Sequence, residues 1–170
     1  LNGEKNVLKF FNKSLILRPS IVYSIDDNFS TTFMTLLNRL PIFPIYYNGK
    51  TKFTPIHCSD MTDIILNAIN KNINSKIIEC VGPEILSFKE ILIILLNSID
   101  KKRFFLPFPL FAAKISAKIF EIMPNPLLTY DQLKLLKYDN VISKNYATNS
   151  SIGVPAKKIF KNEIEKYSYM

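Results

Sequence analysis

The stretch SLILRPSIVYS (residues 14–24) decides the fold, because it has the apolar character of a buried strand. Arg18 and Pro19 stand in its middle, where a charge and a missing backbone N–H are both unfavourable inside a sheet. We predict a single strand over residues 14–23 that is kinked at the proline. Only 13 residues precede this strand, which raises the question of where the rest of its sheet lies.

Helices and short strands alternate along the rest of the chain. Helix-start signals stand at Asp27 and Asn28, Ser87 can cap a later helix, and either Ser59 or Asp60 can cap the helix between them. Further helices are expected at 4–12, 110–123, 130–139 and 156–167, a second buried strand at 75–82, and an irregular linker at 101–109. Strands joined by crossover helices form parallel sheets, and two long strands are too few to stand alone. We therefore predict the last part of a larger parallel sheet.

Composition narrows the class of protein. The chain has 170 residues, of which 48% are hydrophobic, so it can bury a core and is not a disordered segment. Its net charge is +8, but only three of its 22 basic residues are arginines, so we do not expect nucleic-acid binding. The longest apolar run, residues 91–96, is far shorter than the ~18 residues of a membrane span. The first residues lack the apolar core of a secretory signal, and we expect a cytoplasmic location.

The residues that bind metals or perform acid–base chemistry are few and scattered. Cys58 and Cys80 lie in apolar segments without CxxC spacing, so two buried free thiols are expected, with a disulfide as the alternative. One histidine and two cysteines at this spacing predict no metal site. His57 is expected to be a packed residue rather than a catalyst, and Asp60 a helix N-cap.

Four stretches occur in the order found in extended short-chain dehydrogenases, the relatives of nucleotide-sugar epimerases. These are ILRPSIVYS with IDDNF (residues 16–29), KFTPIHCSDMTDIILNAI (52–69), KIIECVGPEILSFKEIL (76–92) and LTYDQLKLLKYDNVIS (128–143). The last stretch follows a Pro-Asn-Pro loop and resembles the NAD(P)H-binding accessory subunit of respiratory complex I and its bacterial homologues. The chain resembles the C-terminal half of such proteins.

The resemblance implies an α/β fold in two parts. Residues 1–83 would be the C-terminal remainder of a Rossmann-type NAD(P)-binding domain, with a parallel sheet, and residues 84–170 a small, mostly helical domain for substrate or partner. The Gly-rich phosphate turn and the catalytic Tyr-x-x-x-Lys of the family are expected before residue 1, so no catalytic residue is assigned in this chain. Two literal matches exist, Tyr46 to Lys50 across a turn and Tyr130 to Lys134, and we reject both as chance matches.

The resemblance also places a cofactor contact. Arg18, Pro19, Ser20 and Ile21 align with the strand end that passes the nicotinamide ring in the family. The alternative is an ordinary strand end with Arg18 reaching to a carboxylate. NAD(P)H is expected in the full-length protein, and none is expected on this chain alone.

A basic and aromatic segment is a candidate contact for a membrane or a protein partner. Its residues are Lys101, Lys102, Arg103, Phe104, Phe105, Lys114 and Lys118. Basic residues beside aromatics, leading into an amphipathic helix, suit an anionic membrane surface, and an apolar helix face also suits a partner protein. The alternative is an ordinary packed helix with solvated lysines.

The resemblance favours a complex-I-associated protein in which NAD(P)H serves structure or assembly. Respiratory complex I subunits are then the expected partners, and the protein would be peripheral on the inner face of a bacterial inner membrane. An active NAD-dependent epimerase, dehydratase or reductase is the alternative. A peripheral interaction domain that uses only the segment 101–123 is a third interpretation.

Overall fold

The computed structural model describes residues 2–74, 76–108 and 135–167. The chain forms two compact units, each assembled from three segments. Unit 1 comprises Leu1–Ile25, Thr54–Ile85 and Val141–Glu163, and unit 2 comprises Asp26–Phe53, Leu86–Asn140 and Ile164–Met170. The division into residues 1–83 and 84–170 stays a prediction, and the chain crosses from unit 1 to unit 2 between Ile85 and Leu86. The functions assigned to the two predicted domains stay predictions.

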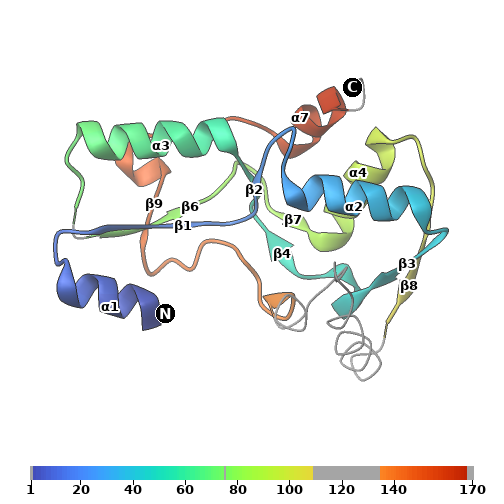
Figure 1. Cartoon of the computed structure of the whole chain (residues 1–170), viewed down its shortest axis with the longest axis horizontal. Helices are drawn as coiled ribbons and strands as arrows, with labels where there is room; N and C mark the ends of the chain where they lie inside the picture. Colours follow the sequence, from blue (N-terminus) through green and yellow to red (C-terminus); the bar gives the residue numbers. More distant parts are fainter. Residues whose placement is uncertain (1, 75, 109–134, 168–170) are drawn as a thin grey trace. The chain divides into compact units, whose positions relative to one another are not determined.

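Unit 1 is built on a parallel sheet, as the sequence predicts. Its strands β1 (Leu15–Pro19), β6 (Lys76–Cys80) and β9 (Ala147–Thr148) lie in the order β1-β6-β9. Leu15 pairs with Lys76 at one end of β1, and Pro19 pairs with Cys80 at the other. The helix α3 (Cys58–Asn70) runs along one face of this sheet and α1 (Asn2–Phe10) lies on the opposite side (Figure 1).

The core of unit 1 lies between α3 and the sheet. Ile56, Ile64, Ile78 and Cys80 are fully buried there, with partly buried side chains of β1 packed against them. The unit also contains η2 (Ser150–Ile152), and α7 (Phe160–Tyr167) begins in it. This apolar layer gives the carboxyl ends of the strands a rigid support.

The predicted single strand over residues 14–23 is two strands, so that prediction is wrong. β1 ends at Pro19, and β2 (Val22–Tyr23) pairs with β5 (Ile56–His57) instead of β6. The chain changes partner at two residues: the Ser20 N–H donates to the Cys80 carbonyl, and the Ile21 carbonyl accepts from the Ile56 N–H. The proline therefore marks the place where the backbone leaves one sheet for another.

Unit 2 contains α2 (Asn28–Arg39), α4 (Phe88–Ser98) and two short strand pairs. β3 (Ile42–Ile45) pairs in parallel with β8 (Phe104–Pro107), and β4 (Lys52–Phe53) pairs antiparallel with β7 (Leu86–Ser87), with η1 (Tyr46–Gly49) following β3. The predicted caps of α2 and α4, Asp27 and Ser87, are confirmed. The Asp27 carboxylate accepts from the Ser30 N–H at 2.6 Å, and Ser87 and Glu90 form a capping box.

Two predicted elements differ from the structure. The segment predicted as an irregular linker contains β8, because Phe105 turns inward onto Phe43 of β3. The last helix starts at Phe160 rather than near residue 156, and the N–H groups of Lys157 and Lys158, which precede it, bind a carboxylate. The helix predicted at 110–123, and most of the one at 130–139, lie outside the described residues.

Candidate functional site

The carboxyl ends of β1 and β6 form the candidate site, since open parallel sheets bind their ligands at this edge. Pro19 and Cys80 end the two strands side by side. Directly after them, the Ser20 hydroxyl accepts a hydrogen bond from the Thr54 N–H at 3.1 Å. Pro19 is exposed, while Ser20 and Ile21 are half-buried. The four predicted cofactor residues therefore stand at the edge where this fold class binds ligands.

Arg18 is held by an ion pair within unit 1. Its guanidinium donates to both oxygens of the Glu4 carboxylate, at 2.8 and 2.7 Å, and its central carbon lies 4.4 Å from the centre of the Tyr146 ring. The hydrogen bond with Glu4 raises the pKa of Arg18, and the same bond lowers the pKa of Glu4. The charge in the strand is thus paired with a carboxylate, as the alternative interpretation has it, and its role toward a cofactor stays a prediction.

The backbone after β6 is packed against the backbone before β5. The Gly82 N–H donates to the Thr54 carbonyl at 3.1 Å. A Cβ atom at Gly82 would lie 1.6 Å from the carbonyl oxygen of Pro55, so a side chain does not fit here. The buried Asn149 amide also accepts from the Val81 N–H at 3.0 Å. These contacts fix the strand edge on both sides of β6.

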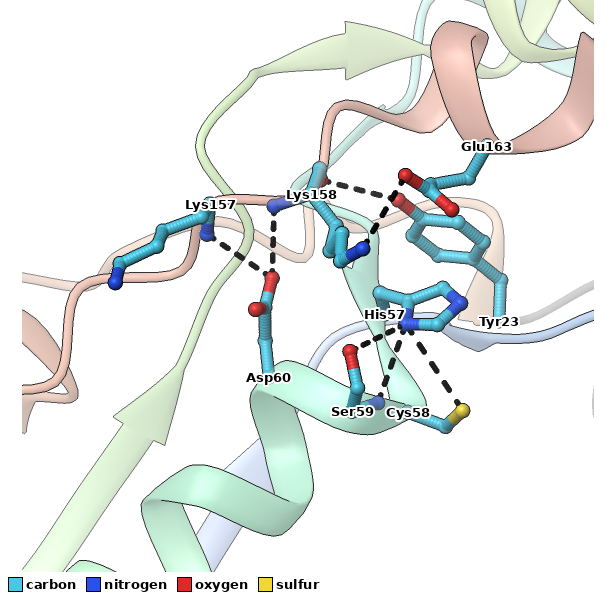
Figure 2. A network of polar contacts seen from close by, with 8 residues as sticks. All are labelled: Tyr23, His57, Cys58, Ser59, Asp60, Lys157, Lys158 and Glu163. Atoms are coloured by element: carbon cyan, nitrogen blue, oxygen red, sulfur yellow. Dashed lines mark hydrogen bonds and ion pairs between the residues drawn. The ribbon is translucent and has the colours of Figure 1, made fainter.

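A polar network surrounds the start of α3 (Figure 2). His57 is the N-cap of this helix: its Nδ1 accepts from the Ser59 N–H at 3.2 Å, and the Ser59 hydroxyl lies 2.8 Å from the same nitrogen. Because Nδ1 accepts, the neutral ring carries its proton on Nε2. The ring also meets Tyr23 edge to face, with centroids 5.2 Å apart. His57 is therefore the packed residue that the sequence predicts.

Asp60 is not the N-cap, which corrects the prediction made for it. Because His57 starts the helix, Asp60 falls in its first turn, and its buried carboxylate accepts from the N–H groups of Lys157 and Lys158 at 3.0 and 2.9 Å. The Tyr23 hydroxyl donates to the carbonyl of Lys158 at 3.0 Å. We call this set of contacts the Asp60 clasp. It joins α3 to a segment nearly a hundred residues later, and sequence reasoning missed it because no local signal marks such a distant pairing.

The chemistry that these groups can perform is limited by their contacts. The Asp60 carboxylate and the His57 Nδ1 both accept backbone N–H groups, which is a structural use of each. Over residues 2–74, 76–108 and 135–167, the His, Cys, Asp and Glu side chains form no group of three that could hold a metal ion. Both cysteines are free, but Cys58 is exposed, contrary to prediction, while burial raises the pKa of Cys80 to about 11. The clasp and the His57 cap thus hold the start of α3 against the segment around Lys157 and Lys158.

The predicted membrane or partner segment is only partly described. Lys101 and Lys102 are exposed, as is Phe104. Arg103 instead donates to the carbonyls that end α2, at 2.7 Å to Leu37 and 3.0 Å to Asn38, a role that the sequence did not reveal. Phe105 packs inward, and Lys114 and Lys118 lie outside the described residues. No helix among the described residues is both long enough and apolar enough to cross a membrane.

Comparison with known sequences finds mitochondrial NADH dehydrogenase [ubiquinone] subunits. The chain is 29% identical over 91 residues to NADH dehydrogenase [ubiquinone] 1 alpha subcomplex subunit 9 of Dictyostelium discoideum, which is 53% of this chain and 25% of that protein. It is 23% identical over 165 residues to the same subunit of Mus musculus, which is 96% of this chain and 44% of that protein. The chain thus spans less than half the length of these relatives. No protein-family model matches it.

Comparison with solved structures finds epimerases and dehydratases. A mutant UDP-glucuronic acid 4-epimerase of Bacillus cereus, in complex with a fluorinated UDP-sugar and NAD, matches 97% of this chain and 48% of its own, with a TM-score of 0.59 and 20% identity. The dTDP-glucose 4,6-dehydratase of Bacillus anthracis, in complex with NAD, matches 96% of this chain and 46% of its own, with a TM-score of 0.61 and 11% identity. The α/β fold class and the resemblance inferred from the sequence are confirmed.

Proposed function

We propose that this chain is part of an NAD(P)-binding, epimerase-like protein of the kind that accompanies respiratory complex I, in which the cofactor serves structure rather than turnover. The observation that carries the proposal is the sequence similarity along 96% of the chain to an alpha subcomplex subunit 9. The fold shared with structures that contain NAD supports the cofactor. A ligand that binds only the native state stabilises it, so NAD(P)H can act here without any reaction.

The geometry supports a cofactor at the carboxyl edge of β1 and β6. Arg18, paired with Glu4, fixes the end of β1, and Pro19 to Ile21 carry the backbone outward from it. Because Pro19 has no N–H, this edge of the sheet has one hydrogen-bond donor fewer. The proline ring can then pack against a flat, partly apolar group of a ligand. In the proposal, Pro19 and Ile21 contact the nicotinamide half of the cofactor.

The test is thermal denaturation of the full-length protein that carries this chain, with and without NADPH or NADH. We expect either cofactor to raise the Tm, and the Pro19→Asp variant to lose that rise. The matched control is Pro155→Asp, which changes another exposed proline of unit 1 in the same way. An equal rise in both variants would contradict the assignment of the site.

The isolated chain gives a second test of the same proposal. The printed sequence contains four glycines and no G-x-x-G-x-x-G turn to hold a pyrophosphate. We therefore expect no appreciable NADPH binding by residues 1–170 alone in isothermal titration calorimetry. A micromolar Kd would contradict this expectation. Co-purification of the full-length protein with respiratory complex I subunits tests the partner assignment separately.

An active NAD-dependent epimerase, dehydratase or reductase is the second candidate function. It is favoured by the solved structures, which include enzymes of the first two kinds. The two candidates differ in turnover: a working enzyme converts a UDP- or dTDP-sugar or consumes reduced cofactor, whereas the structural protein binds the cofactor without either change. Product analysis after incubation of the full-length protein with NAD and these sugars separates them.

A further inference from the structure

The parallel pair β3 and β8 in unit 2 has two different faces. Its register places Ile42 opposite Phe104 and Pro44 opposite Leu106. Since side chains alternate along a strand, these four residues share one face of the pair. The other face carries Phe43 and Phe105, which meet edge to face, and Phe43 packs on Phe33 of α2. One face is therefore part of the core of unit 2.

The first face is apolar and open to solvent. Phe104 is 78% exposed, Ile42 54% and Leu106 51%, while Pro44 between them is half-buried. Large apolar side chains scattered singly over a surface need no explanation, but four on adjacent strands form a continuous patch. We call these four residues the β3–β8 outer face.

Basic residues gather at one end of this face. Because the two strands are parallel, the residues that precede each of them lie at the same edge. Lys101 and Lys102 come shortly before β8, and Arg39 comes shortly before β3, and all three are exposed. Asp100 is the acidic residue beside them in the sequence. The end of the β3–β8 outer face therefore carries an excess of positive charge in a chain whose net charge is already +8.

We propose that the β3–β8 outer face docks on an anionic lipid surface. Phe104, Ile42 and Leu106 would enter the boundary between headgroups and acyl chains, and the basic edge would lie against lipid phosphates. The composition favours lipid over a protein partner, because lysine is depleted at protein–protein interfaces, whereas lysine beside apolar residues is typical of membrane-surface segments. This inference concerns unit 2 and does not depend on cofactor binding or on association with complex I.

Vesicle flotation tests the proposal directly. The chain is expected to float with vesicles of equal parts phosphatidylcholine and phosphatidylglycerol and not with vesicles of phosphatidylcholine alone. A Lys101→Glu, Lys102→Glu variant should lose more than about tenfold of its partition coefficient, since each basic residue near such a surface contributes about fivefold. Lys5→Glu, Lys9→Glu in α1 of unit 1 is the matched charge control and should partition like the wild type.

Tryptophan fluorescence tests whether the apolar side chains of the β3–β8 outer face enter the lipid. The chain has no tryptophan, so Phe104→Trp supplies a single emission signal at an exposed position where substitution leaves the core intact. Its emission should shift to the blue when anionic vesicles are added, and circular dichroism checks that the variant is folded. Phe10→Trp is the matched control, because Phe10 is 73% exposed on α1 of unit 1, and its emission should stay unchanged.

Three results would overturn the proposal. The first is flotation that the Lys101 and Lys102 variant does not weaken. The second is a blue shift of equal size at Phe10→Trp and Phe104→Trp, which would show adsorption without a defined face. The third is the absence of vesicle binding, together with a blue shift of the Phe104→Trp emission when an acidic protein partner is added. That result would make the β3–β8 outer face a protein interface.

Discussion

Asp60→Ala is predicted to release the segment around Lys157 and Lys158 and to destabilise unit 1. The Asp60 carboxylate accepts two backbone N–H groups, at 3.0 and 2.9 Å, and lies in a buried position. A hydrogen bond to a charged group contributes about 1.5–3 kcal/mol, and a buried donor left without a partner costs a similar amount. Lys157 is exposed, so water can reach part of the vacated site. The two bonds together contribute about 3–6 kcal/mol, and we therefore expect a loss near the lower limit of that range, about 3 kcal/mol.

Asp60→Asn separates charge from geometry. Both N–H groups bind the same carboxylate oxygen, Oδ2. An asparagine carbonyl oxygen can occupy this position, so the variant keeps both bonds and loses only the negative charge and its interaction with the start of α3. The expected loss is about 1 kcal/mol, the difference between charged and neutral acceptors together with a helix-terminus contribution.

Urea unfolding followed by circular dichroism measures the global change, and amide hydrogen exchange measures the local one. The amides of Lys157 and Lys158 should lose protection in Asp60→Ala before the rest of unit 1 does. Asp63→Ala on the same helix is the matched control, because Asp63 is exposed and carries the same charge. A change below about 0.5 kcal/mol in Asp60→Ala, or unaltered protection of both amides, would refute the reasoning.

Three further predictions concern the strand edge and its surroundings. Gly82→Ala places a Cβ 1.6 Å from the Pro55 carbonyl oxygen, so urea unfolding should show a loss of about 3 kcal/mol or more, and a neutral result would contradict the close backbone approach. Burial raises the Cys80 pKa to about 11, so iodoacetamide at neutral pH should modify Cys58 in the native protein and Cys80 only after unfolding; equal rates by mass spectrometry would be inconsistent with its burial. The ion pair lowers the Glu4 pKa, so its stabilisation is present above the ordinary glutamate pKa and is lost as pH falls through the lowered value. Glu4→Gln should therefore flatten the acid side of the Tm–pH curve, and parallel curves would contradict this sign.

The parts of the fold that the sequence predicted correctly depend on neighbouring residues. Ser87 and Glu90 stand three positions apart and satisfy each other's backbone donors, so a few letters define the start of α4. Asp27 marks α2 in the same way. The parallel sheet followed from two apolar strands separated by helices. In each case the decisive interaction lies within one element or in the order of elements.

The features that the sequence did not predict depend on residues far apart in the chain. Asp60 is a residue type that often caps helices, but His57 is the N-cap of α3. The Asp60 carboxylate instead accepts hydrogen bonds from backbone N–H groups far along the chain. Arg103 stands in a basic segment and was predicted to contact a membrane or a partner, but its guanidinium donates to the carbonyls at the end of α2. The hydrogen-bond partners of these two residues depend on which distant segment packs against them, and a single sequence does not show which segment that is.

The Asp60 clasp also has a consequence for how the chain acquires its structure during synthesis. Unit 1 is completed by residues 141–163, and the hydrogen bond from Tyr23 to Lys158 closes a loop of 135 residues. Contacts of such high sequence separation form late, because a long loop must close before any of them is gained. The third strand of the sheet, β9, and the Asp60 clasp therefore form only after residues 141–163 have left the ribosome. Until then, the surface that Lys157 and Lys158 later cover on α3 stays open to solvent and to chaperones.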